Sequence, residues 1–182
     1  MKNKKIIRIT TVPESFNTLL KGQLNYMGNF FNIIGITSPE YPFNLVKDNE
    51  DVKFIPLKMT RVISPLSDFI SLIKLYFIFK KERPDIVHTH TPKAGLLGML
   101  ASFFARVPYR MHTVAGLPLL EKKGIKRLVL ELVEKITYMC STKIYPNSFL
   151  LKDIIINSRF CNEDKIRIIG NGSSNGIDLD YF

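Results

Sequence analysis

The chain has 182 residues, and its 26 Lys and Arg against 16 Asp and Glu give a formal net charge of +10 with histidine neutral. Apolar residues make up 46% of the sequence and charged residues 23%, which is typical of a globular domain and excludes a mainly disordered chain. Two cysteines, Cys140 and Cys161, are too few for a disulfide framework and favour a reducing compartment. The basic start of the chain lacks the apolar stretch of an export signal, and no apolar run reaches the roughly 20 residues of a membrane span.

Strands and helices are predicted to alternate along the sequence, which is typical of βαβ units and a parallel sheet. Short β-rich or apolar runs predict strands at 5–12, 30–37, 52–59, 85–90, 107–114, 143–146 and 165–169. Apolar residues at helical spacing predict helices at 15–29, 64–83, 92–106, 125–140 and 148–157, with Ser15 as the cap of the first. Segments 39–51 and 116–124 are predicted to be loops. The expected fold is α/β, a Rossmann-like doubly wound and mainly parallel sheet with helices on both faces.

Three of the predicted helices carry further information. Helix 64–83 is apolar on more than one side, so one side is expected to face the sheet and another to face a partner domain, a neighbouring helix or a membrane surface. In helix 92–106, Gly95 and Gly98 leave one face thin for close packing on a sheet. Helix 125–140 is amphipathic, with six apolar residues on one face: Ile125, Leu128, Val129, Leu132, Val133 and Ile136.

Doubly wound sheets bind ligands at the carboxyl ends of their strands, so the residues at this edge are the candidate site. Neither the Gly-x-Gly-x-x-Gly fingerprint nor the phosphate-binding P-loop pattern occurs there. All three histidines lie at this edge, His88 and His90 on one strand and His112 on the neighbouring one. The first two point to the same face because they are two residues apart. Three interpretations stay open: a metal pair without an obvious third ligand, buried structural histidines, and a polar pocket that holds a hydroxyl or moves a proton.

The excess positive charge favours an anionic partner, and two basic residues at the same edge are candidates for its site. Lys93 lies in the first turn of a predicted helix, where an ammonium and free backbone N–H groups together favour an anion. Arg61 is a candidate phosphate ligand. The alternative for Lys93 is a solvated side chain at the end of a helix. The alternative for Arg61 is an ion pair with Asp68. No zinc-finger spacing or aromatic-basic RNA-binding signature occurs, so nucleic acid is not an expected partner.

Three segments together resemble a known family. Residues 84–95 (PDIVHTHTPKAG), residues 107–118 (VPYRMHTVAGLP) and residues 168–178 (IIGNGSSNGID), with Phe182 after them, are similar in order and spacing to segments of family 4 retaining glycosyltransferases. These enzymes serve capsule, O-antigen and exopolysaccharide synthesis. The resemblance covers essentially the whole chain. It is specific for the family, but it says little about the substrate.

The resemblance implies one half of a GT-B fold, with an acceptor-binding domain over 1–169 and the start of an interdomain linker over 170–182. It also implies metal-independent transfer with retention of configuration, no cofactor, and a nucleotide-sugar donor that binds mainly to a second domain. That second domain is absent here, and so is its motif of two Glu residues eight apart. The chain alone is therefore expected to be inactive.

The resemblance also assigns site residues by matching position. His112 matches the histidine near the acceptor and the reacting sugar, and is the expected catalytic residue. Ser15 lies in the first loop, which faces the donor in this family, although Pro13-Glu14-Ser15 replaces the usual Gly-Gly there. The other expected substrate-binding residues are Arg61, His88, His90, Lys93, Thr113, Asn171 and Gly172.

The expected acceptor is a saccharide on a lipid carrier. Apolar and cationic residues in 69–79 and 119–127 suit docking on an anionic membrane surface, so the expected location is cytoplasmic, on the inner face of the membrane. Two other functions stay open at this point. One is a non-catalytic module that binds a nucleotide or an anionic lipid, and the other is half of a sugar-nucleotide epimerase.

Overall fold

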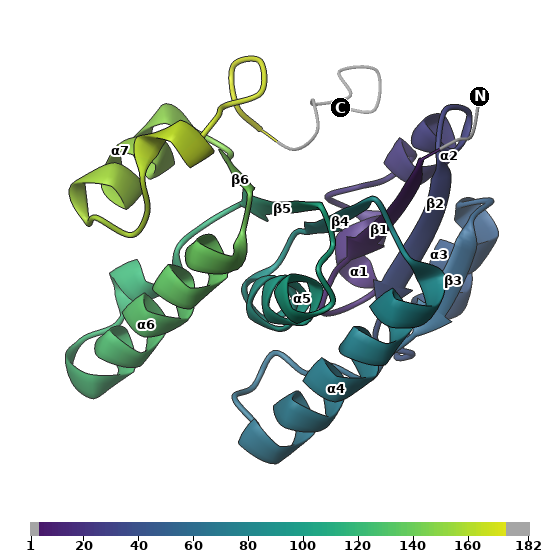
Figure 1. Ribbon diagram of the computed structural model, residues 1–182, viewed down its shortest axis with the longest axis horizontal. Coiled ribbons are helices and arrows are strands. Elements are labelled where there is room, and N and C mark those ends of the chain that lie inside the picture. The colour runs from purple at the N-terminus through teal and green to yellow at the C-terminus, as the bar shows by residue number, and fades with distance from the viewer. Residues whose placement is uncertain (1–3, 174–182) are drawn as a thin grey trace.

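The computed structural model describes residues 4–173, in which six strands form one parallel sheet of order β3-β2-β1-β4-β5-β6 (Figure 1). The chain runs outward from β1 to β3 and then returns to the other side of β1 to add β4, so the topological switch point lies between β1 and β4. This architecture confirms the predicted doubly wound α/β fold. The strands are β1 (Lys5–Ile9), β2 (Asn32–Thr37), β3 (Lys53–Pro56), β4 (Ile86–Thr89), β5 (Tyr109–Val114) and β6 (Lys143–Pro146).

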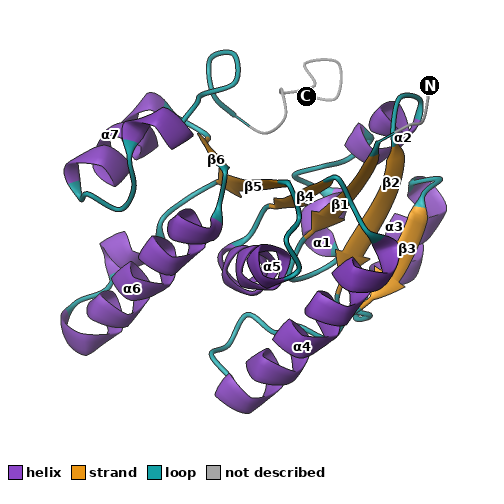
Figure 2. Ribbon diagram, viewed as in Figure 1, coloured by secondary structure: helices purple, strands orange, loops and turns teal. Residues whose placement is uncertain are grey.

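Helices cover both faces of the sheet, and α4, α5 and α6 lie side by side as one layer (Figure 2). Two short 3-10 turns, Pro118–Glu121 and Glu163–Lys165, lie in connecting segments. The α-helices are α1 (Glu14–Asn17), α2 (Gln23–Gly28), α3 (Phe43–Asn49), α4 (Pro65–Glu82), α5 (Pro92–Phe104), α6 (Gly124–Cys140) and α7 (Phe149–Asn157).

Alternation along β1 divides the core between the two faces of the sheet. Ile7 and Ile9 are fully buried in a cluster that includes Leu75 of α4 and Met99 of α5. Ile6 packs in a second cluster with residues of α1, α2 and α3. A third cluster joins β5 and β6 to α6 and α7. Arg8, between Ile7 and Ile9, therefore points to the α1–α3 face, which is the face of the site described below.

The thin face of α5 packs closely on the sheet, as predicted. A Cβ atom on Gly95 would lie 2.5 Å from Cε1 of His112, and one on Gly98 would lie 2.6 Å from Cγ2 of Thr89. Such distances leave no room for a side chain, so both glycines are required for α5 to approach β4 and β5.

The N-terminal third of the chain differs from the prediction. A single helix was predicted over 15–29, but Gly22 adopts φ 73° and separates α1 from α2. Ser15 is not a helix cap because α1 already begins at Glu14, after Pro13, and Ser15 is buried within it. The predicted loop 39–51 contains helix α3, where Val46 is buried against α1 and α2. Tertiary packing, more than local propensity, decides these short elements.

The last predicted strand, residues 165–169, does not form a full strand either. Within residues 165–169 only Ile166 forms a β-bridge, in parallel to Ile144 of β6. The backbone N–H of Arg167 donates to the carbonyl of Ile144 at 2.9 Å, so this segment still follows the edge of the sheet. It thereby leads the chain back to the carboxyl edge.

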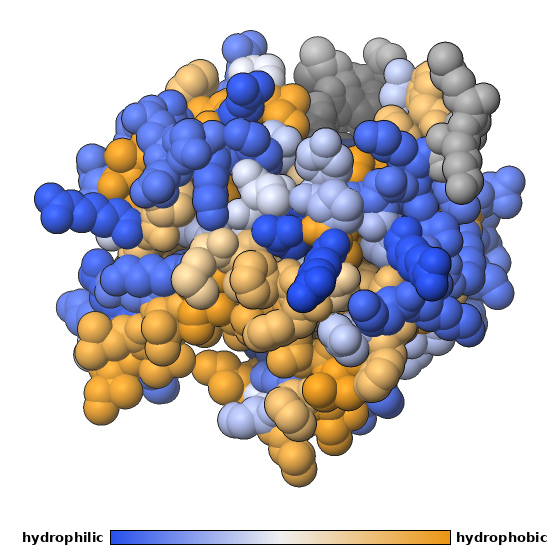
Figure 3. Space-filling model, viewed as in Figure 1, coloured by the Kyte–Doolittle hydropathy of each residue, from blue (hydrophilic) through white to orange (hydrophobic). Residues whose placement is uncertain are grey.

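The outer sides of α4 and α6 form an exposed apolar surface, and Figure 3 shows hydrophobic residues gathered over these two helices at the lower side of the molecule. The sequence predicted an apolar face on α6 but not its direction. The apolar stripe of its first turns faces outward, while Tyr138 and Cys140 of its last turn are buried. No helix in the described part of the chain is long and apolar enough to span a bilayer. We call the following residues the α4–α6 surface: Leu66, Phe69, Ile70, Ile73, Phe77, Ile125, Leu128, Val129 and Leu132.

Candidate functional site

A cavity of about 230 Å³ opens at the carboxyl edge of the sheet, beside the switch point between β1 and β4. Ligands bind at this position in doubly wound folds. Strand ends, α2 and the segment after β6 all contribute to it. We call it the Arg8 pocket, and its lining residues are Arg8, Leu20, Gln23, His88, His90, Thr113, Tyr145, Pro146, Asn147, Ile169 and Ser173.

Arg8 supplies the only charged side chain among the described residues of this lining. Its side chain is 3% exposed. Nε and Nη2 donate to Nε2 of His90 at 3.1 and 3.0 Å, and Nη1 donates to Oε1 of Gln23 at 3.0 Å. Burial lowers the pKa of Arg8 to about 10, so the guanidinium is still charged at neutral pH.

His88 and His90 stand side by side in the pocket, with ring centroids 4.1 Å apart. Nε2 of His88 lies 2.8 Å from Oγ1 of Thr113 on β5. Burial is the main cause that lowers the pKa of both imidazoles well below 6.5, and the nearby Arg8 charge adds to it. Both rings are therefore neutral at pH 7, which suits hydrogen bonding to a polar ligand and leaves Arg8 as the cation.

The start of α2 borders the pocket and is fixed by Glu50. The carboxylate of Glu50 accepts from the backbone N–H of Gly22 at 2.7 Å and of Asn25 at 2.9 Å. It thus satisfies N–H groups that the first turn of a helix otherwise leaves unpaired. Gln23 follows Gly22 directly, so this contact holds Gln23 at the pocket.

The segment after β6 closes another side of the pocket. Gly172 adopts φ 91°, and a Cβ atom there would lie 2.4 Å from the carbonyl oxygen of Asn147. The N–H of Ser173 donates to that same oxygen at 2.8 Å. Gly172 thus packs against Asn147 of the lining, but neither Gly172 nor the exposed Asn171 is itself a lining residue. The rest of the predicted linker, residues 174–182, lies outside the described residues.

His112 lies on the opposite face of the sheet from His88 and His90. It pairs across the strands with Thr89, and its Nδ1 lies 2.7 Å from Oγ1 of that residue. The ring is buried beneath Gly95 of α5, and burial lowers its pKa to about 4. The three predicted histidines thus share one edge of the sheet, but they are divided between its two faces.

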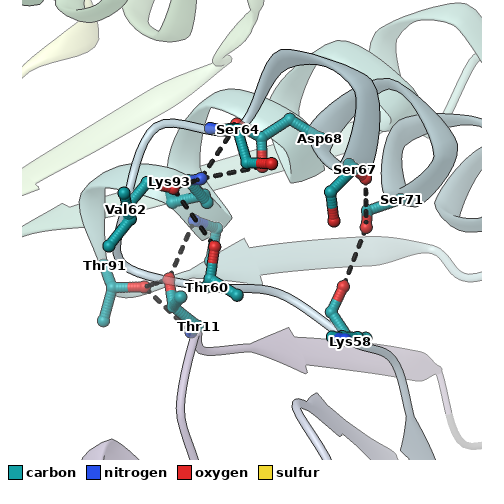
Figure 4. A network of polar contacts seen from close by, with 11 residues as sticks. Thr11, Lys58, Thr60, Val62, Ser64, Ser67, Asp68, Ser71, Thr91 and Lys93 are labelled. Atoms are coloured by element: carbon teal, nitrogen blue, oxygen red, sulfur yellow. Dashed lines mark hydrogen bonds and ion pairs between the residues drawn. The ribbon is translucent and has the colours of Figure 1, made fainter.

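Lys93 and Arg61 lie outside the pocket, at the corner where α4 and α5 begin. The ammonium of Lys93 donates to both carboxylate oxygens of Asp68, at 2.7 and 2.8 Å, and to the carbonyl of Val62 (Figure 4). Asp68 therefore pairs with Lys93, which corrects the alternative that it pairs with Arg61. Arg61 itself is exposed.

The predicted anion site at the start of α5 is occupied by protein groups. Oγ1 of Thr11 accepts from the N–H of Ala94 at 3.3 Å and lies 2.6 Å from Oγ1 of Thr91, as Figure 4 shows in part. Lys93 is already paired with a carboxylate. Since both the amide and the ammonium have partners, this helix start is not a free anion site.

Arg8, Gln23 and Tyr145 are pocket residues that the sequence analysis missed. An arginine in the middle of an apolar strand, as in Ile6-Ile7-Arg8-Ile9, was the available signal, because an unexplained buried charge is rare. Tyr145 lies within β6, and its ring centroid is 6.0 Å from that of His88. Within residues 4–173 no three His, Cys, Asp or Glu side chains gather as a possible metal site.

Comparison with curated proteins gives two informative relatives. The chain is 42% identical over all its 182 residues to the capsular polysaccharide biosynthesis glycosyltransferase CapM of Staphylococcus aureus, of which it covers 47%. Over 131 residues it is 38% identical to the UDP-Gal:alpha-D-GlcNAc-diphosphoundecaprenol alpha-1,3-galactosyltransferase of Escherichia coli, an overlap of 71% of this chain and 32% of that protein. The chain thus spans half the length or less of these relatives.

Solved structures share the fold at low sequence identity. The match to a glycosyltransferase from Rickettsia africae covers all of this chain and 45% of that protein's chain. Its TM-score is 0.72, and the sequence identity is 19%. A putative UDP-N-acetylglucosamine 2-epimerase from Listeria monocytogenes matches 94% of this chain and 46% of its own with a TM-score of 0.70 and 19% identity. Residues 36–172, most of the chain, match the family described as glycosyl transferase 4-like domain. The chain therefore belongs to the glycosyl transferase 4-like family.

Proposed function

We propose that this chain is the acceptor-binding part of a retaining glycosyltransferase. The enzyme moves a sugar from a nucleotide sugar to a lipid-linked saccharide in cell-surface polysaccharide synthesis. Its relatives support this, since one is named for capsular polysaccharide synthesis and another for a diphosphoundecaprenol-linked acceptor. The observation that carries the proposal is the Arg8 pocket, a buried cation among hydrogen-bonding groups at the switch point of a doubly wound sheet.

The proposal divides the reaction between two domains. This chain holds the acceptor, while a second domain holds most of the nucleotide sugar, so this chain alone does not turn over. The transfer uses no metal or other cofactor. His88, His90 and Thr113 hold acceptor hydroxyls, because they are neutral polar groups inside the pocket.

His112 is proposed as the residue that acts nearest to the reacting sugar, through position and electrostatics. Its hydrogen bond to Thr89 connects it to β4, the strand that also presents His88. Arg61 and Lys93 lie at the same sheet edge, and an acceptor that extends beyond the pocket reaches them. Three further residues are proposed substrate contacts: Ser15, Asn171 and Gly172.

The α4–α6 surface is proposed to dock on an anionic membrane. Four exposed cations, Lys122, Lys123, Lys126 and Arg127, lie directly before and within the first turn of α6, next to its exposed apolar side chains. Apolar insertion and attraction to anionic headgroups act together in such a surface. The proposed location is therefore cytoplasmic, peripheral on the inner face of the membrane that holds the acceptor.

Calorimetric titration with two ligands tests the proposed function. A short-chain prenyl-diphosphate sugar is expected to bind to this chain, UDP is expected not to, and His112→Ala and Arg61→Ala are expected to weaken the first. Tight binding of UDP without a response to the prenyl diphosphate would favour a nucleotide-binding module. An epimerase half is the weaker alternative, because its structural likeness at 19% identity reflects the fold alone.

A further inference from the structure

Arg8 is a buried cation that no carboxylate of the described residues contacts directly. Its side chain is 3% exposed, and among the described residues no carboxylate forms an ion pair with it. Taking a charge out of water costs several kcal/mol unless a partner compensates it. The position of Arg8 in the sheet therefore carries a cost that no direct ion pair offsets, although the charge of Glu50 acts on it through space.

The groups that contact Arg8 are neutral. His90 accepts two of its N–H groups with one nitrogen, and Gln23 and Sδ of Met27 accept from Nη1 at 3.0 and 3.4 Å. The charge of Glu50 acts on Arg8 through space, but both carboxylate oxygens of Glu50 accept from backbone N–H groups at the start of α2, those of Gly22 and Asn25. Neutral acceptors orient a guanidinium without neutralising it, so the charge is held in a fixed direction.

The space in front of this charge has the size and chemistry for part of a ligand. A cavity of about 230 Å³ is below the roughly 300–1,000 Å³ of pockets that enclose a whole drug-sized molecule. Its described lining offers amide, hydroxyl and imidazole groups and no carboxylate that would repel an anion. A tetrahedral oxyanion is a group that matches a guanidinium in geometry and charge.

We propose that the Arg8 pocket binds a phosphate or diphosphate group, with Arg8 as its charged ligand and Gln23 and His90 as the residues that position the guanidinium. This inference rests on the proposed function and adds a chemical part to it. The source we expect is the diphosphate that joins the acceptor sugar to its lipid. A nucleotide diphosphate is the other source of the same chemistry, and the experiment below separates the two.

The test measures the binding of three probes to the 182-residue chain by calorimetry: inorganic pyrophosphate, a short-chain prenyl-diphosphate sugar, and UDP. Arg8→Gln removes the charge, and Arg8→Lys keeps it without the guanidinium geometry. Arg83→Gln is the matched control, because Arg83 is exposed at the end of α4, on the opposite edge of the sheet. We expect Arg8→Gln to weaken pyrophosphate and the prenyl-diphosphate sugar at least about tenfold, Arg8→Lys to weaken them less, and the control to change nothing.

The outcomes separate this inference from the proposed function. Arg8-dependent binding of pyrophosphate and UDP, without binding of the prenyl-diphosphate sugar, would keep the anion site and overturn the acceptor assignment. Equal binding of the prenyl-diphosphate sugar to wild type and Arg8→Gln would keep the acceptor assignment and overturn the anion site. Absence of binding by all three probes would overturn the anion site as well.

A measurement on the wild-type chain keeps the proposal testable if the Arg8 variants fail to fold. Pyrophosphate next to Arg8 is expected to shift the NMR signal of Nε2 of His90, the ring nitrogen that accepts from the guanidinium. The backbone amide signal of Arg83, at the opposite edge of the sheet, serves as an internal control. Shifts that are absent at His90, or equal at His90 and Arg83, would contradict a site at Arg8.

Discussion

Two nitrogens of the Arg8 guanidinium, Nε and Nη2, donate to a single atom of His90, its Nε2, at 3.1 and 3.0 Å. Because arginine has no acceptor, the ring must use a lone pair on Nε2, so neutral His90 carries its proton on Nδ1. One hydrogen-bonded pair thus fixes both the direction of a buried charge and the tautomer of a pocket histidine.

The buried histidines are expected to make folding stability depend on pH. His112 has a pKa of about 4 in the folded chain against 6.5 as a free side chain, so unfolding takes up a proton below pH 6.5. Stability is therefore fully present above pH 6.5 and falls as the pH falls. From pH 7 to pH 5 the loss for His112 is about 2 kcal/mol, and His88 and His90 act in the same direction.

Urea denaturation at pH 7, 6 and 5 measures this loss as the free energy of unfolding. His112→Asn removes one titrating ring and is expected to reduce the drop between pH 7 and pH 5 by about 2 kcal/mol. A drop of the same size in wild type and variant would mean that His112 ionises alike in the folded and unfolded chain.

Gly95→Ala is expected to lower stability because its Cβ atom would meet the buried ring of His112 at 2.5 Å. Overpacking of this kind costs about 1–3 kcal/mol. Gly116→Ala is the matched control, since no atom lies within 4 Å of its added Cβ. The control should stay within about 0.5 kcal/mol of wild type. Equal thermal denaturation midpoints for the two variants would show that α5 can move away from β5 at little cost.

The ion pair between Lys93 and Asp68 is expected to join α4 to α5 more strongly than a surface pair does. The two side chains are 12% and 20% exposed, whereas Arg127 and Glu131, which form a pair on α6, are 50% and 25% exposed. A double-mutant cycle with Lys93→Met and Asp68→Asn is expected to give a coupling of about 1–2 kcal/mol. The Arg127 and Glu131 cycle should give about 0.5 kcal/mol or less. Similar couplings from the two cycles would contradict a special role for the α4–α5 contact.

Membrane docking by the α4–α6 surface is testable with vesicles. Leu128→Asp places a charge among exposed apolar residues and is expected to reduce sedimentation with vesicles that contain phosphatidylglycerol by at least about fivefold. Leu45→Asp is the control, because Leu45 is also exposed but lies on α3, outside this surface. Binding should weaken with salt, since cations before and within α6 contribute. If the two substitutions have equal effects, or if neither has an effect, membrane docking by the α4–α6 surface is contradicted.

The sequence predicted the fold because its strands and long helices carry strong periodic signals. Strand β4 and helix α5, for example, follow from an apolar run, a proline start and small residues on one face. Short elements were harder to predict. Helix α3 depends on tertiary packing, and the division between α1 and α2 depends on the left-handed conformation of Gly22. For α6 the pattern correctly identified an apolar face, but periodicity alone does not tell whether such a face meets the core or the outside.

The candidate site was only partly predictable. The rule for the carboxyl edge brought His88, His90 and Thr113 to one pocket, as it should for neighbouring strands. It did not tell on which face of the sheet His112 lies, since this depends on the register between β4 and β5. Arg8 was missed because a residue within β1 reaches the edge only through the length of its side chain, and sequence position does not show this.

The alternation of β4 constrains how this strand can change over evolution. His88 and Thr89 are neighbours in sequence, yet one enters the pocket and the other contacts Gly98 and His112 under α5. Loss or gain of one residue would exchange the two faces and place an imidazole where α5 leaves no room for it. Point substitutions in β4 are therefore more tolerable than changes in its length, and divergent sequences should vary in loop length on either side of it.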